Sequence, residues 1–115
     1  MASILNFLAQ GMWLSRQAEN VVINNLANYE TPGFQQQELS FQQALGQAWQ
    51  QGLPVSTVQG TLVKQGGAVR ADGSGVSLTQ QMASLMQWEM VYATASTGYH
   101  DEATEIRAAA EGQAM

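Results

Sequence analysis

The side chains best suited to chemistry cluster near the C-terminus of this 115-residue chain. His100, Asp101, Glu102 and Glu105 combine an imidazole with carboxylates, and Asp101 and Glu105 are spaced to share one helix face. Such groups can bind a metal ion, but the chain has one histidine and no cysteine to complete a ligand set. The pattern therefore predicts a solvated acidic surface and no metal site.

No other motif predicts catalysis or cofactor binding. The glycines in Gly66-Gly67 and Gly73-Ser74-Gly75 lack the lysine and the strand-turn-helix context of a phosphate-binding loop, so they predict linkers. Acid–base catalysis by paired carboxylates needs a concave pocket, which a two-helix scaffold hardly provides. We therefore expect a protein that is not an enzyme, with no catalytic residue and no cofactor.

Charge and hydropathy exclude further classes. The formal net charge is −5, and no cluster of Lys and Arg is present to neutralise nucleic-acid phosphates. No apolar run approaches the roughly 18 residues that cross a bilayer, so no membrane span is expected. Arg16 is the first charged residue, which leaves no basic start for a cleavable secretory signal.

Two segments space their apolar and small residues in heptads, as helices that pack along a seam do. Residues 3–28 add a flanking row of Phe7, Leu14 and Val21, which widens the apolar stripe. Residues 77–111 start with a capping-box pattern at Ser77 and are expected to end at Gly112. The seam residues expected at the helix pair or at contacts between subunits are Ile4, Leu8, Gly11, Ser15, Ala18, Val22, Leu78, Met82, Leu85, Tyr92, Tyr99 and Ile106.

The segment between the helices, residues 29–76, holds both prolines and is rich in glutamine and glycine. A short helix over 38–47 and β-prone pieces over 55–58 and 61–63 are expected within an otherwise flexible stretch. The chain is therefore predicted to be mainly α, with its terminal helices paired as an antiparallel coiled coil. The expected parts are an N-terminal coiled-coil helix over residues 1–28, a turn and flexible middle over 29–76, and a C-terminal coiled-coil helix over 77–115. Three tryptophans are candidates for contacts between subunits: Trp13, Trp49 and Trp88.

The most specific motif lies at the end of the first helix and reads Asn24-Asn25-Leu26-Ala27-Asn28-Tyr29-Glu30-Thr31-Pro32-Gly33-Phe34. Asn28 tolerates the left-handed conformation in which many helices end. Pro32-Gly33 favours a type II turn, because proline sets φ and glycine accepts a positive φ. Phe34 then supplies an aromatic anchor toward the helix end or a neighbouring chain.

These eleven positions resemble the signature of the flagellar axial proteins, the rod, hook and distal-rod family. Residues 35–41, the start of the second helix and the short length resemble proximal rod proteins within that family. Two positions depart from the pattern. Gln35 stands where a basic residue is usual, and Ser77 where an aspartate is usual, so salt bridges at these positions are in doubt.

The resemblance implies a structural subunit of the bacterial flagellar basal-body rod. Such subunits are exported from the cytoplasm by the flagellar type III apparatus without a cleavable signal. They assemble helically into the periplasmic drive shaft that links motor to hook. The implied partners are copies of the chain itself, other rod proteins, and adaptor and export-gate proteins at the rod base. The alternatives are another rod subunit, or a cytoplasmic coiled-coil adaptor or secretion chaperone.

Overall fold

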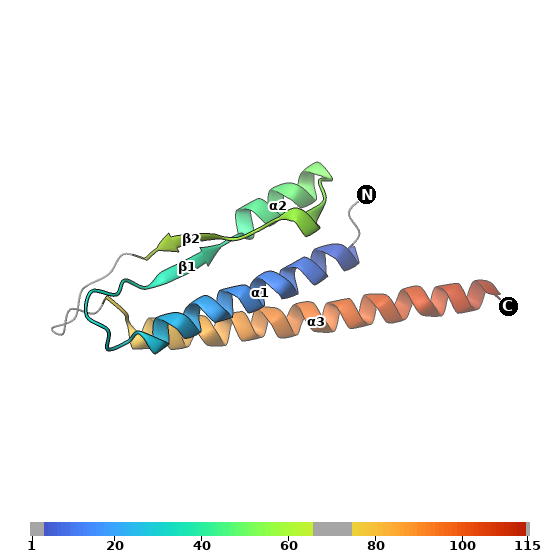
Figure 1. Ribbon diagram of the computed structural model, residues 1–115. Coiled ribbons are helices and arrows are strands. Elements are labelled where there is room, and N and C mark those ends of the chain that lie inside the picture. The colour runs from blue at the N-terminus through green and yellow to red at the C-terminus, as the bar shows by residue number, and fades with distance from the viewer. Residues whose placement is uncertain (1–3, 66–74, 115) are drawn as a thin grey trace.

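The longest elements of this computed structural model, which describes residues 4–65 and 75–114, are two helices. They are α1 (Ile4–Ala27) and α3 (Leu78–Ala114), and they lie side by side (Figure 1). Between them in sequence come β1 (Gln37–Ser40), α2 (Gln42–Gln51), the 3₁₀ turn η1 (Val55–Thr57) and β2 (Thr61–Lys64). These elements form a layer on one face of the helix pair, and the molecule measures 69 × 25 × 14 Å.

The two long helices run in opposite directions. The Asn25 amide donates to Gln81 Oε1 at 2.8 Å near one end of α1. Near the other end, a methyl group added at Gly98 would lie 3.6 Å from the Leu8 side chain. As the residue number rises along α1 it falls along α3, which defines an antiparallel pair with a single register. Knobs-into-holes packing along this pair stays a prediction.

The main core lies between α1 and the layer formed by the middle segment. Leu14 and Ala18 of α1 pack against Leu39 and Phe41 of the middle segment. The same cluster also contains residues from further along the chain, namely Leu45, Ala48 and Val55. The flanking row of α1 carries this contact, because Leu14 is fully buried and Phe7 and Val21 pack against the same cluster. The other row of α1, including Ser15, Val22 and Asn25, is also buried. Helix α1 is therefore covered on two faces.

The described part of the middle segment is folded, in contrast to the flexible stretch that its composition predicts. β1 and β2 form an antiparallel two-stranded sheet in which Leu39 lies opposite Leu62. Residues 38–40 are strand where a helix was expected, because Leu39 then alternates inward while its neighbours stay exposed. Residues 55–57 are a 3₁₀ turn, with Val55 buried, where a β-prone piece was expected. Residues 61–63 do form a strand.

Two glycines make the layer possible. Gly52 ends α2 with φ +69°, and the amide of Leu53 donates to the Ala48 carbonyl at 2.9 Å, which closes the helix end. A side chain at Gly60 would place its Cβ 2.5 Å from Leu39 Cγ, so the strand can approach the core only with glycine there. The expected linkers at Gly66-Gly67 and Gly73-Ser74 lie outside the described residues.

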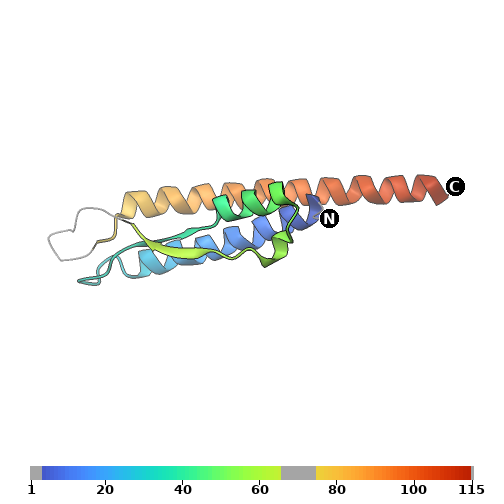
Figure 2. The same ribbon diagram turned by 90° about the horizontal axis from the view of Figure 1, so that it is seen from above.

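Helix α3 begins where its sequence signal predicts and ends later than predicted. The Gln80 amide donates to Ser77 Oγ at 3.3 Å, so Ser77 supplies one half of the predicted capping box. The helix continues through Gly112 to Ala114, so the predicted stop is wrong. Glycine is tolerated inside a helix at a cost of about 1 kcal/mol, and nothing at Gly112 forces a left-handed turn. Seen from above, α3 extends well beyond the start of α1 (Figure 2).

Candidate functional site

The segment after α1 forms the turn that its sequence predicts. Gly33 has φ +80°, and the Phe34 amide donates to the Thr31 carbonyl at 3.3 Å, as in a type II turn over residues 31–34. Thr31, Pro32 and Gly33 are exposed, whereas Phe34 is half-buried. The Phe34 carbonyl accepts a 2.7 Å hydrogen bond from Gly75, which joins the turn to the approach of α3.

The helix end itself differs from the prediction for Asn28. No described residue other than glycine has a positive φ, so Asn28 does not end α1 in the left-handed conformation. Its side chain instead donates to the Asn24 carbonyl at 2.9 Å, and its Oδ1 accepts from Thr31 Oγ1 at 3.1 Å. Asn28 thus satisfies a terminal carbonyl and connects the helix to the turn through its side chain.

A cluster of buried amides holds this turn against α3. Asn25 is fully buried, and its side chain pairs with the backbone of Gln37 as a strand would, accepting from the amide at 2.9 Å and donating to the carbonyl at 2.7 Å. Gln81, 1% exposed, accepts from Asn25 and donates to Gln36 Oε1 at 2.9 Å. Gln36 also accepts from the Ser77 amide at 2.9 Å. We call Asn25, Gln36 and Gln81 the amide cluster.

Sequence reasoning missed two members of the amide cluster. Gln36 and Gln81 read as ordinary members of a glutamine-rich chain. The signal that points to them is Asn25, a polar residue in an apolar seam, because a buried amide requires polar partners. The cluster unites α1, the turn, β1 and α3 at one end of the molecule, and it gives Asn25 the polar partners that its burial requires.

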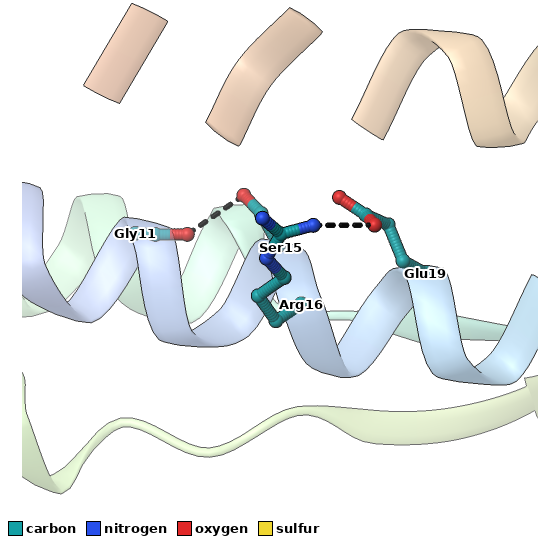
Figure 3. Close-up of polar contacts among 4 residues, drawn as sticks. All are labelled: Gly11, Ser15, Arg16 and Glu19. Atoms are coloured by element: carbon teal, nitrogen blue, oxygen red, sulfur yellow. Dashed lines mark hydrogen bonds and ion pairs between the residues drawn. The ribbon is translucent and has the colours of Figure 1, made fainter. Parts of the chain in front are cut away.

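A second polar group lies halfway along the helix pair (Figure 3). Arg16 Nη1 donates to Glu19 Oε2 at 3.0 Å, and the guanidinium lies 3.7 Å above the Tyr92 ring of α3. Ser15 Oγ donates to the Gly11 carbonyl at 2.7 Å, which satisfies a buried hydroxyl in the seam. Tyr92, and to a smaller degree Glu19, raise the pKa of Arg16 further above its ordinary value. Arg16 therefore stays charged and keeps the buried Glu19 carboxylate paired.

Glu19 is 6% exposed, and its Oε1 has no hydrogen-bond partner within the part of the chain that the structure describes. The ion pair with Arg16 thus uses one carboxylate oxygen only. The contact of Arg16 with the Tyr92 ring connects this pair on α1 to α3.

The predicted seam residues fall into three groups by exposure. Ser15, Ala18 and Val22 are buried. Half-buried positions are Leu8, Gly11, Leu85 and Tyr92. The exposed positions, between 37% and 51%, are Ile4, Leu78, Met82, Tyr99 and Ile106.

The face of α3 that meets the rest of the chain is rotated from the predicted seam. Trp88 is not one of the predicted seam residues, yet it is half-buried and its ring lies 5.3 Å from that of Phe41. The reason is that α3 must meet the middle layer as well as α1. The exposed seam residues and Met86 and Met90 of α3 are consequently left on the outer surface.

The acidic C-terminal residues form no metal site in this arrangement. Among the described residues, no group of three or more histidine, aspartate or glutamate side chains is placed to hold a metal ion. Asp101 is exposed and Glu102 half-buried on α3. No helix in the described ranges has the length and apolar character that crossing a membrane requires.

A comparison with protein families finds a match in the N-terminal part of the chain. A family model described as flagella basal body rod protein matches residues 5–35. The matched stretch is α1 and the turn that follows it, which includes Asn25 and Gly33. The rod family is structural, with no enzymatic activity attached to it. No curated protein matches the chain.

Proposed function

We propose that this chain is a structural subunit of the bacterial flagellar basal-body rod. The match of residues 5–35 to the rod family is the observation that carries the proposal. The geometry supports it, because two residues within the match hold α1 and the turn to the α3 region: Asn25 donates to Gln81, and the Phe34 carbonyl accepts from Gly75.

Two finer features belong to the same proposal. The chain is a proximal rod subunit, exported by the flagellar type III apparatus and built helically into the shaft between motor and hook. Its neighbours are copies of itself, other rod proteins, and the adaptor and export-gate proteins at the rod base. The exposed apolar side chains of α3 support assembly, since monomeric proteins rarely leave such a row uncovered.

Gene deletion with complementation tests the proposal directly. Cells without the gene are expected to lack rod, hook and filament in electron micrographs, and the intact gene is expected to restore them. The chain should also be detected in purified basal bodies by an antibody raised against it. Normal basal bodies in the deletion strain, with the chain absent from the purified structures, would refute the proposal.

A matched pair of variants links the phenotype to the helix pair. Val22 is 5% exposed and faces the core, while its neighbour Ile23 is 51% exposed. We expect Val22→Asp to abolish complementation and Ile23→Asp to fold normally. If both variants complement as well as the intact gene, the helix pair is not required for assembly.

The runner-up is a cytoplasmic coiled-coil adaptor or secretion chaperone. The acidic residues of the C-terminal half favour it, because a chaperone can use such a surface to hold a basic substrate. In that case the chain stays in the cytosol in a stoichiometric complex with an export substrate. Fractionation of the complemented strain separates the two functions.

A further inference from the structure

The C-terminal part of α3 has no helix beside it in the described chain. The register that sets Leu8 opposite Gly98 brings Ile4, the first described residue of α1, opposite Glu102. Residues 103–114 therefore extend past α1 by about 18 Å, at 1.5 Å per residue, as both views show (Figures 1 and 2). We call residues 103–114 the overhang.

The overhang continues the apolar seam that α1 covers further back. Ala103, Ile106 and Ala110 are spaced by three and four residues, so they share one face of the helix. Ile106 is 51% exposed. Five of the twelve residues of the overhang are alanine, so another surface can approach the helix backbone closely there.

An apolar groove lies elsewhere on the molecule, where α1, α2 and α3 meet. Its volume is about 340 Å³. Its walls include Leu8 of α1, Leu45 of α2, and Trp88 and Val91 of α3, and no charged side chain lines it. Two glycines in its lining, Gly11 and Gly46, have open space where a Cβ would stand. At these two glycines no side chain covers the backbone of the groove wall, so a side chain inserted from outside can approach that backbone closely.

We propose that the overhang of one copy of this chain docks in the groove of a second copy, with Ile106 inserted beside Gly46. The groove is continuous with the α1–α3 interface, since Leu8 lines it and also meets Gly98. The overhang presents the same kind of surface to it, one aliphatic side chain between alanines. The groove carries no charge, so it suits the apolar face of the overhang. Gln42 and Gln87 in the groove lining can hydrogen-bond to acidic or basic side chains that flank this apolar face.

The contact joins two different surfaces, so two copies cannot satisfy both surfaces by one contact. Each copy that docks its overhang keeps its own groove free for the next, which produces a series of subunits that is open unless its rotation closes it into a ring. The biological setting of this contact rests on the proposed function, but the contact itself is a property of the purified chain.

The absence of cysteine from the sequence makes a disulfide test unambiguous. Ile106→Cys and Gly46→Cys are introduced singly into separate chains, mixed at high protein concentration and oxidised. Within one chain, residue 106 lies eleven residues further along α3 than Ala95, which lines the groove with Gly46. At 1.5 Å per residue this is about 16 Å, so a bond between positions 46 and 106 must join two copies. Ala108→Cys is the matched control, because residue 108 is exposed on the opposite face of the overhang.

The mixture is expected to give a heterodimer at roughly ten times the rate seen when Ala108→Cys replaces Ile106→Cys, which corresponds to about 1.4 kcal/mol of preference. A chain carrying both Ile106→Cys and Gly46→Cys is expected to give a ladder of multimers. Equal rates for positions 106 and 108, or no heterodimer at any concentration, would overturn the proposal. So would dimers from Ile106→Cys alone, which indicate a symmetric contact.

The outcome is independent of the deletion experiment. If the deletion strain builds normal flagella while the ladder forms, the self-contact stands and the rod function fails. If the ladder is absent while the deletion strain lacks rods, the rod function stands and this contact fails. Ile106→Asp, compared with Ala108→Asp, extends the test to cells, since both positions are exposed and both variants should fold.

Discussion

Replacing Asn25 with leucine removes the centre of the amide cluster while preserving the size of the side chain. Three hydrogen bonds are lost, two to the Gln37 backbone and one to Gln81 Oε1. Gln81 is 1% exposed, so water cannot replace the lost donor without opening the core. A buried polar group without a partner costs about 1–3 kcal/mol, and half-buried Gln37 recovers part of its loss from water. We therefore expect a loss of about 2–4 kcal/mol.

Urea unfolding followed by tryptophan fluorescence and circular dichroism measures this loss. With a slope of about 1–3 kcal/mol per molar urea for a chain of this size, the midpoint should fall by at least about 0.7 M. The control is Asn24→Leu, the same substitution at the neighbouring exposed position. It should change stability by less than about 0.5 kcal/mol.

Equal losses for the two variants would refute the reasoning, because burial and hydrogen bonding would then not distinguish them. A further check combines Asn25→Leu with Gln81→Leu. Removing both partners leaves fewer orphaned groups than the two single changes suggest, so the double variant should lose less than their sum. Strict additivity would show that the two amides do not depend on each other.

Four other substitutions test separate parts of the structure by the same unfolding assay. Gly33→Ala should lower the free energy of unfolding by about 1 kcal/mol, because the residue has φ +80°. Gly46→Ala should raise it by up to about 1 kcal/mol, because Gly46 lies inside α2 with open space at its Cβ position. The opposite order of stabilities would contradict the turn geometry. Phe41→Ala should cost about 3–5 kcal/mol, and a loss below 1 kcal/mol would mean that the middle layer does not share the core. Arg16→Ala should lower the urea midpoint more than Arg107→Ala, because only Arg16 pairs a buried carboxylate; equal midpoints would count against that pairing.

The helices and the turn were predictable because local physics specifies them. Heptad spacing locates α1 and α3 to within a few residues, and Pro32-Gly33 specifies the turn before any contact is known. Ser77 gives the start of α3 for the same reason, since its cap depends on a residue three positions away. Each of these features is decided within one or two helical turns of sequence.

The middle layer and the amide cluster were not predictable, because they depend on contacts between distant residues. Leu39 and Phe41 are too few to predict a packed layer by pattern alone, and they become core only because the Leu14 row of α1 lies beneath them. The bond between Asn25 and Gln81 spans 56 residues, and no local pattern selects Gln81 from the many glutamines. The rotation of α3 that leaves Trp88 half-buried has the same cause, because α3 packs against both α1 and the middle layer.

The distance along the chain between α1 and its partner also governs when the protein can fold. Leu8 meets Gly98 and Asn25 meets Gln81, so the seam of α1 finds no cover until almost the whole chain is present. A chain that emerges N-terminus first, from a ribosome or through any narrow conduit, carries α1 with that seam bare until the last residues follow. Closing so long a loop is slow compared with forming a helix. Completion of synthesis or passage, rather than its start, is therefore the event that permits folding.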